Sequence, residues 1–291
     1  MAMRLITTAD DFGASRAVNE AVAEAYRKGT LTSASLIVTG NAAHEAVALA
    51  HEMPGLAVGL HLTLSSGKSA LPVHAVPHLV DRASHFSSND VRAALRYYFF
   101  GGQVRRELRA EIEAQFDTFA RFELSLSHID GHQHLHAHPT VLPIVIELAE
   151  AYGAAGIRVP QEDLLCSLRI DRSRLCYKVI VALGHAILAR TCRRKLKNSS
   201  LVCCSHAIGS MMSGRMSEDY VIGVLSALRA NNVEVFFHPS KEDSGDPFGP
   251  NTGDLKTLLS PRLKEFFDSE SILLATYADL KRDVEAPSGS S

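Results

Sequence analysis

The sequence predicts an α/β protein that folds as an irregular (β/α) barrel of mostly parallel strands. Short runs rich in apolar and β-branched residues alternate with segments of helical periodicity along almost the whole chain. Strands that alternate with helices pair in parallel through crossover connections. About seven such units in 291 residues favour a barrel. Strands are expected at residues 4–8, 33–39, 56–64, 126–130, 156–159, 201–204, 233–238 and 272–277.

Helical patterns occupy most of the intervals between these runs, and the first of them ends at Gly29. Two stretches without either period, residues 65–90 and 240–254, predict long loops of the kind that form lids or binding loops. No linker or internal repeat divides the chain. We therefore expect one catalytic domain over residues 1–284 and a disordered tail at 285–291. Helices are expected near residues 15–28, 44–51, 103–122 and 177–197.

The composition argues against several classes of protein. Thirty basic and 32 acidic residues give a formal net charge of −2, which provides no overall attraction to nucleic acid. The five cysteines are odd in number and form no CxxC pair, so neither a disulfide framework nor a cysteine zinc site is expected. No signal-peptide pattern is visible, and the longest apolar run, Val179 to Ala189, is shorter than the roughly 20 residues that span a bilayer. These features predict a cytoplasmic protein.

Two adjacent carboxylates, Asp10 and Asp11, end the first predicted strand. Barrel and open-sheet enzymes place their chemistry at this edge, where parallel strands end. The pair is costly to bury without a cation, because like charges repel and both lose hydration. A metal ion bound by one carboxylate would leave the other as a general base. The alternative interpretation is a helix N-cap and turn ahead of Gly13.

Histidines gather at the ends of later strands. His61 lies in the third predicted strand, where a hydrogen-bonded structural role is the alternative to metal binding. Five of the eleven residues from 128 to 138 are histidine, a density that metal or proton chemistry explains better than a solvated loop does. His238 ends a further strand and, taken with the other strand ends, is the best candidate for a general acid. The dense tract contains His128, His132, His134, His136 and His138.

Several motifs stand in an order and at a spacing that resemble one family, the YdjC-like, chitooligosaccharide-deacetylase type of carbohydrate deacetylases. The resemblance runs from about Leu5 to Asp279, and Ser240 departs from it where many relatives have glycine after the HP pair. Three other segments are similar to the hopanoid-biosynthesis-associated branch of that family: RYYFFGGQVRRELRAEIEAQFDTF, GSMMSGRM at 209–216 and LLSPRLKEFF. The family motifs are TADDFG, GTLTSASLIVTG, VGLHLTL, HIDGHQHLHAHP, GIRVPQE and FFHP.

The resemblance implies a barrel of the polysaccharide-deacetylase type with one divalent metal ion. It implies that Asp11, His61 and His132 hold the metal, that Asp10 is the catalytic base and that His238 is the acid. Two histidines and one carboxylate suit zinc, cobalt, iron or nickel better than magnesium by ligand softness, but the resemblance leaves magnesium open. The resemblance also implies that Arg158 matches a position that orients a carboxylate or contacts substrate. Since not all five histidines of the tract can be ligands, His134 and His136 are predicted substrate contacts.

The implied reaction is hydrolysis of the N-acetyl group of an amino sugar. The substrate is either the N-acetylglucosamine headgroup of a hopanoid glycolipid or a soluble chito-oligosaccharide. The segment Tyr177–Lys197 is apolar and ends in basic residues, which fits peripheral contact with the inner face of a membrane. Its alternative is an ordinary packing helix with a solvated cationic end. A homodimer is compatible with the sequence.

Two other functions compete with deacetylation. A metal-independent glycoside hydrolase would use Asp10 with a second carboxylate such as Asp130 or Glu162. A non-catalytic sugar-binding protein on a degenerate barrel is the other alternative. The joint presence of a base, three ligands and an acid argues against it.

Overall fold

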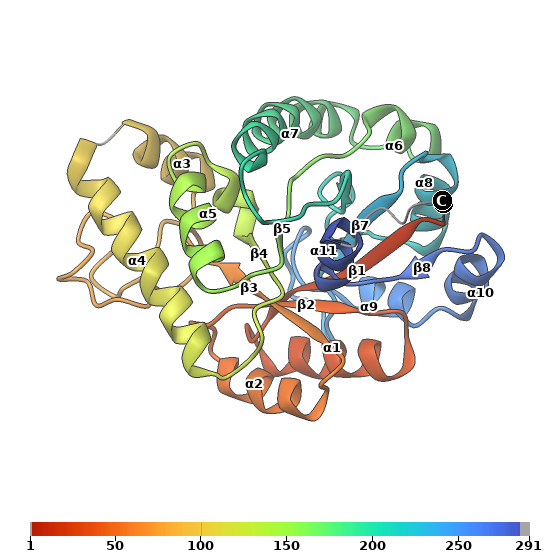
Figure 1. Ribbon diagram of the computed structural model, residues 1–291, viewed down its shortest axis with the longest axis horizontal. Coiled ribbons are helices and arrows are strands. Elements are labelled where there is room, and N and C mark those ends of the chain that lie inside the picture. Colours follow the sequence, from red (N-terminus) through yellow and green to blue (C-terminus); the bar gives the residue numbers. More distant parts are fainter. Residues whose placement is uncertain (1, 100, 286–291) are drawn as a thin grey trace.

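The computed structural model describes residues 2–99 and 101–285 (Figure 1). Its eight strands form one sheet in which every strand pair is parallel, with the order β5-β4-β3-β2-β1-β7-β6 and with β8 beside β1. The strands are β1 (Arg4–Phe12), β2 (Ser33–Leu36), β3 (Ala57–Leu62), β4 (His128–Gly131), β5 (Gly156–Ile157), β6 (His206–Ile208), β7 (Asn232–Phe237) and β8 (Leu273–Leu274).

The helices lie around the strands, with α1 and α2 on one side of the sheet and α7 on the other (Figure 1). The described residues form the α-helices α1 (Arg16–Lys28), α2 (Ala43–Glu52), α3 (Asp90–Phe99), α4 (Gly101–Arg121), α5 (Leu142–Ala151), α6 (Leu164–Ile170), α7 (Leu175–Leu196), α8 (Glu218–Ala227), α9 (Thr252–Leu258), α10 (Pro261–Ser269) and α11 (Tyr277–Glu285), and the 3-10 helix η1 (His132–Ala137).

β1 is the central strand, and it is buried from Leu5 to Phe12. β7 pairs with it from Arg4 to Ala9 along one edge. β8 and β2 share the other edge, β8 beside the first residues of β1 and β2 from Thr8 onward. The polar end of β1 is therefore held between two neighbours at the carboxyl edge of the sheet.

The two ends of the strand order, β5 and β6, are joined by isolated contacts instead of a continuous ladder. Val202 forms a parallel bridge with Gly156, and the amide of Ala207 donates to the carbonyl oxygen of Gln161. This seam makes the barrel irregular. The predicted α/β class with parallel strands is confirmed.

The structure differs from the predictions in several places, among them the expected loop at 240–254, in which α9 begins at Thr252. Residues 201–204 form only the bridge at Val202, and the strand lies at β6 instead, because this segment is the one that pairs with β7. Within the expected loop at 65–90, α3 begins at Asp90. The expectation that no apolar segment is long enough to span a bilayer is wrong. By length and composition alone, the 22-residue helix α7 is long and apolar enough to do so. The expected tail falls outside the described residues except for Glu285, which ends α11.

Candidate metal and catalytic site

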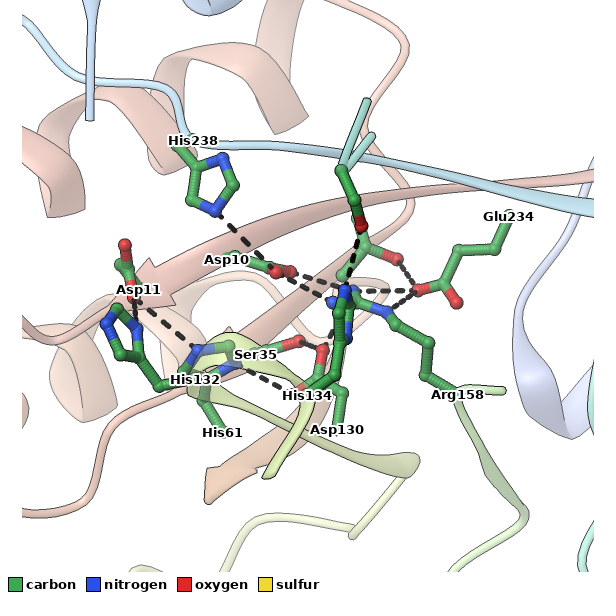
Figure 2. Close-up of polar contacts among 12 residues, drawn as sticks. Asp10, Asp11, Ser35, His61, Asp130, His132, His134, Arg158, Glu234 and His238 are labelled. Atoms are coloured by element: carbon green, nitrogen blue, oxygen red, sulfur yellow. Dashed lines mark hydrogen bonds and ion pairs between the residues drawn. The ribbon is translucent and has the colours of Figure 1, made fainter. Parts of the chain in front are cut away.

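Asp10 and Asp11 both reach the same site because β1 is irregular at its end. Successive side chains of a regular strand point to opposite faces, so only one of two adjacent aspartates would face inward. Here the pairing of β1 with β2 shifts register between Ala9 and Phe12, and Asp11 has φ 62°. A bulge with a left-handed residue re-aims its side chain. Both carboxylates are buried, and Figure 2 shows Asp10 directed toward Arg158 and Asp11 beside His61 and His132.

Asp11, His61 and His132 form a cluster that could hold a metal ion. Asp11 Oδ1 lies 3.5 Å from His61 Nε2 and 3.6 Å from His132 Nδ1 (Figure 2). The three side chains come from the ends of β1, β3 and β4, and their ligand atoms lie within 4.8 Å of one another. The structure therefore brings together the three residues that the sequence analysis names as ligands.

The donor atoms of this cluster fit a divalent cation. Asp11 Oδ1 is buried and has no hydrogen-bond partner among the described residues. Burial alone would raise the pKa of Asp11, but His132, His61 and His238 hold it well below its usual value, so the group is a carboxylate. One carboxylate oxygen and two imidazole nitrogens around one point are ligands for zinc and similar ions.

Asp130 orients His61 toward Asp11. The two residues are partners in the register of β3 and β4, and His61 Nδ1 donates to Asp130 Oδ1 at 2.9 Å. This bond leaves His61 Nε2 directed at Asp11. Burial would lower the pKa of His61, but the surrounding carboxylates, Asp130 first, outweigh it and raise the pKa to about 9. A carboxylate behind a metal-binding histidine is a common arrangement that fixes its tautomer.

Arg158 holds the base candidate in place. Its Nη1 and Nη2 each donate to one oxygen of Asp10 at 2.7 Å, and the guanidinium also contacts Asp130 at 2.8 Å and Glu234 at 2.9 Å (Figure 2). Arg158 is fully buried, and its ring of carboxylates keeps its pKa well above the usual value despite that burial. The side chain therefore orients carboxylates, and none of its surface is open to a substrate.

His238 lies on the other side of Asp10. Its Nε2 is 4.0 Å from Asp10 Oδ2, and its side chain is partly exposed. The amide of His238 donates to the buried carboxylate of Asp254 at 2.8 Å, which fixes the turn after β7. Ser240, the residue that departs from the expected motif, is buried and bonds through its amide to the carbonyl oxygen of Asn251. The loop after the acid candidate is thus ordered by backbone contacts.

The other histidines of the dense tract have separate places. His134 Nε2 lies 2.9 Å from Ser210 Oγ and its ring packs on His185, away from Asp11. His136 is fully buried and donates to the carbonyl oxygen of Arg158 at 2.9 Å. The predicted substrate contact is therefore not supported for His136, because its ring has no exposed surface and its bond holds the backbone of Arg158. The remaining members, His128 and His138, are buried on Tyr277 and beside Tyr97 respectively.

Glu234 and Ser35 belong to the site although the sequence analysis did not name them. Glu234 accepts from Arg158, from Thr8 and from Tyr277. Ser35 donates to Asp130 at 2.6 Å. The sequence did contain a sign of the role of Glu234, which is the charged residue of the apolar strand NVEVFF. A carboxylate in a fully buried strand needs a cationic partner.

Comparisons with known proteins place the chain in a family. The profile described as YdjC-like protein matches residues 4–269. The chain belongs to the YdjC-like family. A carbohydrate deacetylase of Brevibacillus brevis is 32% identical over 285 residues, which cover 96% of this chain and all of that protein. A chitooligosaccharide deacetylase of Serratia marcescens is 29% identical and covers 95% and 98% of the two chains.

A solved structure agrees with the fold. A putative cellobiose-phosphate cleavage protein from Enterococcus faecalis superposes with a TM-score of 0.74 at 25% identity, over 96% of this chain and 99% of that one. The similarity to this structure and to the two deacetylases extends over at least 95% of this chain. The Brevibacillus brevis and Serratia marcescens relatives are both named as deacetylases of carbohydrates, and the predicted enzyme class is thereby confirmed.

Proposed function

We propose that this YdjC-like protein is a metal-dependent hydrolase that removes the N-acetyl group from an amino sugar. The observation that carries the proposal is the convergence of Asp11, His61 and His132 on one point, with Asp10 and His238 beside them. Hydrolysis of an amide needs an activated water, a stabilised oxyanion and a protonated leaving nitrogen. The five residues supply candidates for each need, and relatives that match the chain from end to end are carbohydrate deacetylases.

A divalent cation held by the three ligands would supply Lewis-acid chemistry, which makes water more acidic and polarises a carbonyl oxygen. Asp10 would accept the proton of the attacking water, and Arg158 fixes both of its oxygens for that role. His238, 4.0 Å from Asp10, would donate a proton to the departing sugar nitrogen. No covalent enzyme intermediate is required. By ligand softness zinc is the first candidate for the ion and cobalt, iron or nickel are substitutes, while magnesium is the alternative that the family resemblance leaves open.

The glycoside hydrolase alternative has less support from the same geometry. Asp130 is fully buried and already bound to Arg158, His61 and Ser35. Glu162 accepts the amides of Ser210 and Met211 and lines a different cavity, beside α7. Neither carboxylate is placed to face Asp10 across a sugar.

The test is acetate release from N-acetylglucosamine and diacetylchitobiose by the protein loaded with zinc or magnesium. We expect activity that EDTA abolishes and added metal restores, with acetate as product and no freed sugar. The Asp10→Asn variant should keep its metal and lose turnover by at least about 100-fold, the range of general-base contributions. A variant as active as the wild type, or a wild type that binds metal and sugar without releasing acetate, would contradict the proposal.

For the natural substrate we propose the N-acetylglucosamine headgroup of a hopanoid glycolipid, with soluble chito-oligosaccharides as the alternative. The feature that favours a lipid-linked sugar is the outer face of α7. Ile180, Leu183 and Ile187 recur at helical spacing and are 64–69% exposed, and the helix ends with Arg193, Arg194 and Lys195 in its last turn. The name of the Serratia marcescens relative favours the soluble sugar instead.

This helix would lie on a membrane surface and not cross it. Its other face is fixed to the protein, because the buried Lys178 binds Asp171 and the hydroxyl of Tyr177 donates to the carbonyl oxygen of Ser210. His185 packs on His134, next to the end of β4. An apolar row with a basic end is typical of peripheral helices on anionic membranes. We accordingly propose a cytoplasmic protein with peripheral contact to the inner membrane face; acetate release from the soluble sugars alone would contradict the glycolipid substrate.

A further inference from the structure

We infer that a basic groove between α7 and the segment after β5 is a binding site for the phosphate group of an acidic phospholipid. The groove is lined by Gln161, Glu162 and one face of residues 182–197, and its volume is about 600 Å³. Its lining includes none of the candidate metal ligands, so it is separate from the candidate active site. The inference goes beyond the proposed deacetylation, and only the choice of a lipid as the source of the phosphate rests on the proposed membrane contact of α7.

Four cationic side chains line the basic groove, and three of them have no counter-charge from the protein. Arg190, Arg194 and Lys197 recur at spacings of four and three residues, which places them on one side of the helix, and all three are exposed. None of them forms an ion pair with a described residue, whereas the exposed Arg109 and Arg262 both pair with glutamates. Like charges gathered around one cavity repel one another, and a bound anion would relieve that repulsion.

The fourth cation, Arg193, is held in one orientation by the protein itself. Its Nε donates to Gln161 Oε1 at 2.9 Å, and its Nη2 donates to the carbonyl oxygens of Ser205 at 2.7 Å and Cys204 at 3.3 Å. Its Nη1 has no partner among the described residues, and the side chain is partly exposed. A fixed guanidinium with N–H groups to spare suits the oxygens of a phosphate. The groove thus combines one preorganised donor with three mobile ones.

One acidic side chain, Glu162, also lines the basic groove. Its Oε1 accepts the amides of Ser210 and Met211 at 2.6 and 3.1 Å, and its Oε2 is buried. Burial raises the pKa of Glu162 to about 7, so near neutral pH much of this carboxyl group is protonated and uncharged. The lining therefore has four positive charges against at most one negative charge, which favours an anionic ligand.

The same helix supplies an apolar surface beside these charges. Leu183 follows the groove residue Ala182 by one position, a rotation of about 100° around the helix. Ile187 follows Ala186 in the same way. With Ile180 these two residues form the exposed apolar row of α7, which therefore runs along the rim of the groove. A phospholipid has the matching form, because its phosphate is joined to acyl chains, whereas a free phosphate or a sugar phosphate would leave the row uncovered.

The basic groove predicts selectivity among phospholipids. Phosphatidylglycerol carries a negative phosphodiester and an uncharged glycerol headgroup. Phosphatidylcholine adds a quaternary ammonium to the same phosphodiester, and the cations of the groove would repel it. The volume lies within the range of small-molecule sites, about 300–1,000 Å³, which leaves room for a glycerol headgroup beside the phosphate. We therefore expect the groove to bind phosphatidylglycerol in preference to phosphatidylcholine.

The experiment measures binding of short-chain lipids, below their critical micelle concentration, to the full chain by titration calorimetry. Dihexanoyl phosphatidylglycerol should bind saturably at one site, and dihexanoyl phosphatidylcholine at least about tenfold more weakly. Arg190→Gln and Lys197→Gln should each weaken binding of the former about tenfold, the effect of losing one charge-assisted hydrogen bond. Lys195→Gln is the matched control, because it removes an equal charge from the last turn of α7 outside the groove, and it should bind like the wild type.

The source of the phosphate is tested with probes that lack acyl chains. Replacing Ile180, Leu183 and Ile187 together by serine should weaken binding of the short-chain lipid and leave binding of glycerophosphoglycerol, the headgroup alone, unchanged. If inorganic phosphate binds the wild type as tightly as the lipid does, the groove is a site for a free anion and the assignment to a phospholipid is wrong.

Two further results would overturn the groove. The first is the absence of saturable binding, and the second is an equal loss in Lys195→Gln and Lys197→Gln, which is typical of diffuse attraction to charge. Either result leaves the proposed deacetylase untouched, because acetate release from soluble sugars is measured separately and should be the same in all these variants. Lys197-dependent lipid binding by a protein that never releases acetate would support the groove and contradict the proposed function alone.

Discussion

Arg158 donates one Nη group to each carboxylate oxygen of Asp10, at 2.7 Å in both cases, from a position with no exposed surface. A planar guanidinium can make this two-point contact, and an ammonium group cannot. The same side chain also contacts Asp130, which in turn holds His61. One arginine therefore sets the position of the candidate base and, through Asp130, of a candidate metal ligand.

Replacing Arg158 by lysine should destabilise the protein and impair turnover together. The change breaks the buried ion pairs of Arg158 with Asp10, Asp130 and Glu234, because a lysine ammonium cannot replace the several directed N–H groups of a guanidinium. We expect the free energy of unfolding to fall by about 3 kcal/mol. We expect this loss in urea unfolding and at least a tenfold drop in kcat. Arg109→Lys is the control, because its exposed pair with Glu147 should change stability by less than about 1 kcal/mol. Equal stability of the two variants would argue against the cluster.

The bond between Asp130 and His61 should govern metal affinity. Asp130→Asn removes the charged acceptor that directs His61 Nε2 toward Asp11, and loss of such a partner usually costs 10- to 100-fold, so we expect roughly that increase in the zinc dissociation constant. Competition with a chromogenic chelator measures it. Asp117→Asn, which neutralises a carboxylate that accepts from Tyr152 and contacts none of the candidate ligands, should bind zinc like the wild type. Unchanged affinity in Asp130→Asn would mean that His61 is not a ligand or needs no orientation.

Glu162 should make stability depend on pH near neutrality. Burial raises its pKa from 4.5 to about 7 in the folded protein, although it accepts the amides of Ser210 and Met211. Between these two pH values the folded state holds the proton more tightly than the unfolded state does, so the free energy of unfolding falls as pH rises from about 4.5 through 7.

The Glu162→Gln variant removes this dependence while it keeps an acceptor for both amides. A shift of this size corresponds to roughly 2–3 kcal/mol, so the variant should match the wild type near pH 5 and be more stable by about that amount at pH 8. Urea unfolding at pH 5, 6, 7 and 8 provides the comparison. A constant difference between the two proteins across this range would show that Glu162 titrates normally.

The sequence was sufficient for the parallel α/β class and for the meeting of strand ends. In parallel strands the carboxyl ends share an edge, so Asp11, His61 and the histidine tract could be expected to meet, while the family resemblance selected His132 within the tract. The bulge at Asp11 could not be predicted from the sequence. Its register shift depends on the pairing of β1 with β2, which is a tertiary property.

Other parts of the site depend on contacts that one sequence does not reveal. Asp130 reaches His61 only because β3 and β4 pair in a particular register. Of the five histidines in the tract, spacing could not separate His132 from His136, since a short 3-10 helix with left-handed residues at Gln133 and His134 replaces the extended segment that alternation assumes. That local turn sends His136 into the interior and leaves His132 beside Asp11.

The exposed row of α7 provides the last prediction, which concerns the proposed membrane contact. Replacing Ile180, Leu183 and Ile187 together by serine should abolish cosedimentation with vesicles that contain phosphatidylglycerol, because these side chains are the apolar surface available for insertion. Neutralising Arg190, Arg194 and Lys197 with glutamine should also weaken binding, by about 1 kcal/mol for each charge, and should remove its dependence on salt. Acetate release from soluble sugars should be unchanged in both variants.

One further variant serves as the control, and the same serine variant tests whether the apolar row of α7 contacts a second copy of the chain instead of a membrane. Val284→Ser changes an equally exposed apolar residue on α11 and should leave vesicle binding intact. Light scattering after size exclusion distinguishes a membrane from a second copy of the chain. A wild type that is dimeric and a triple serine variant that is monomeric, with no vesicle binding by either, would assign the row to a homodimer, because an apolar face of this kind is buried equally well by another protein surface as by lipid.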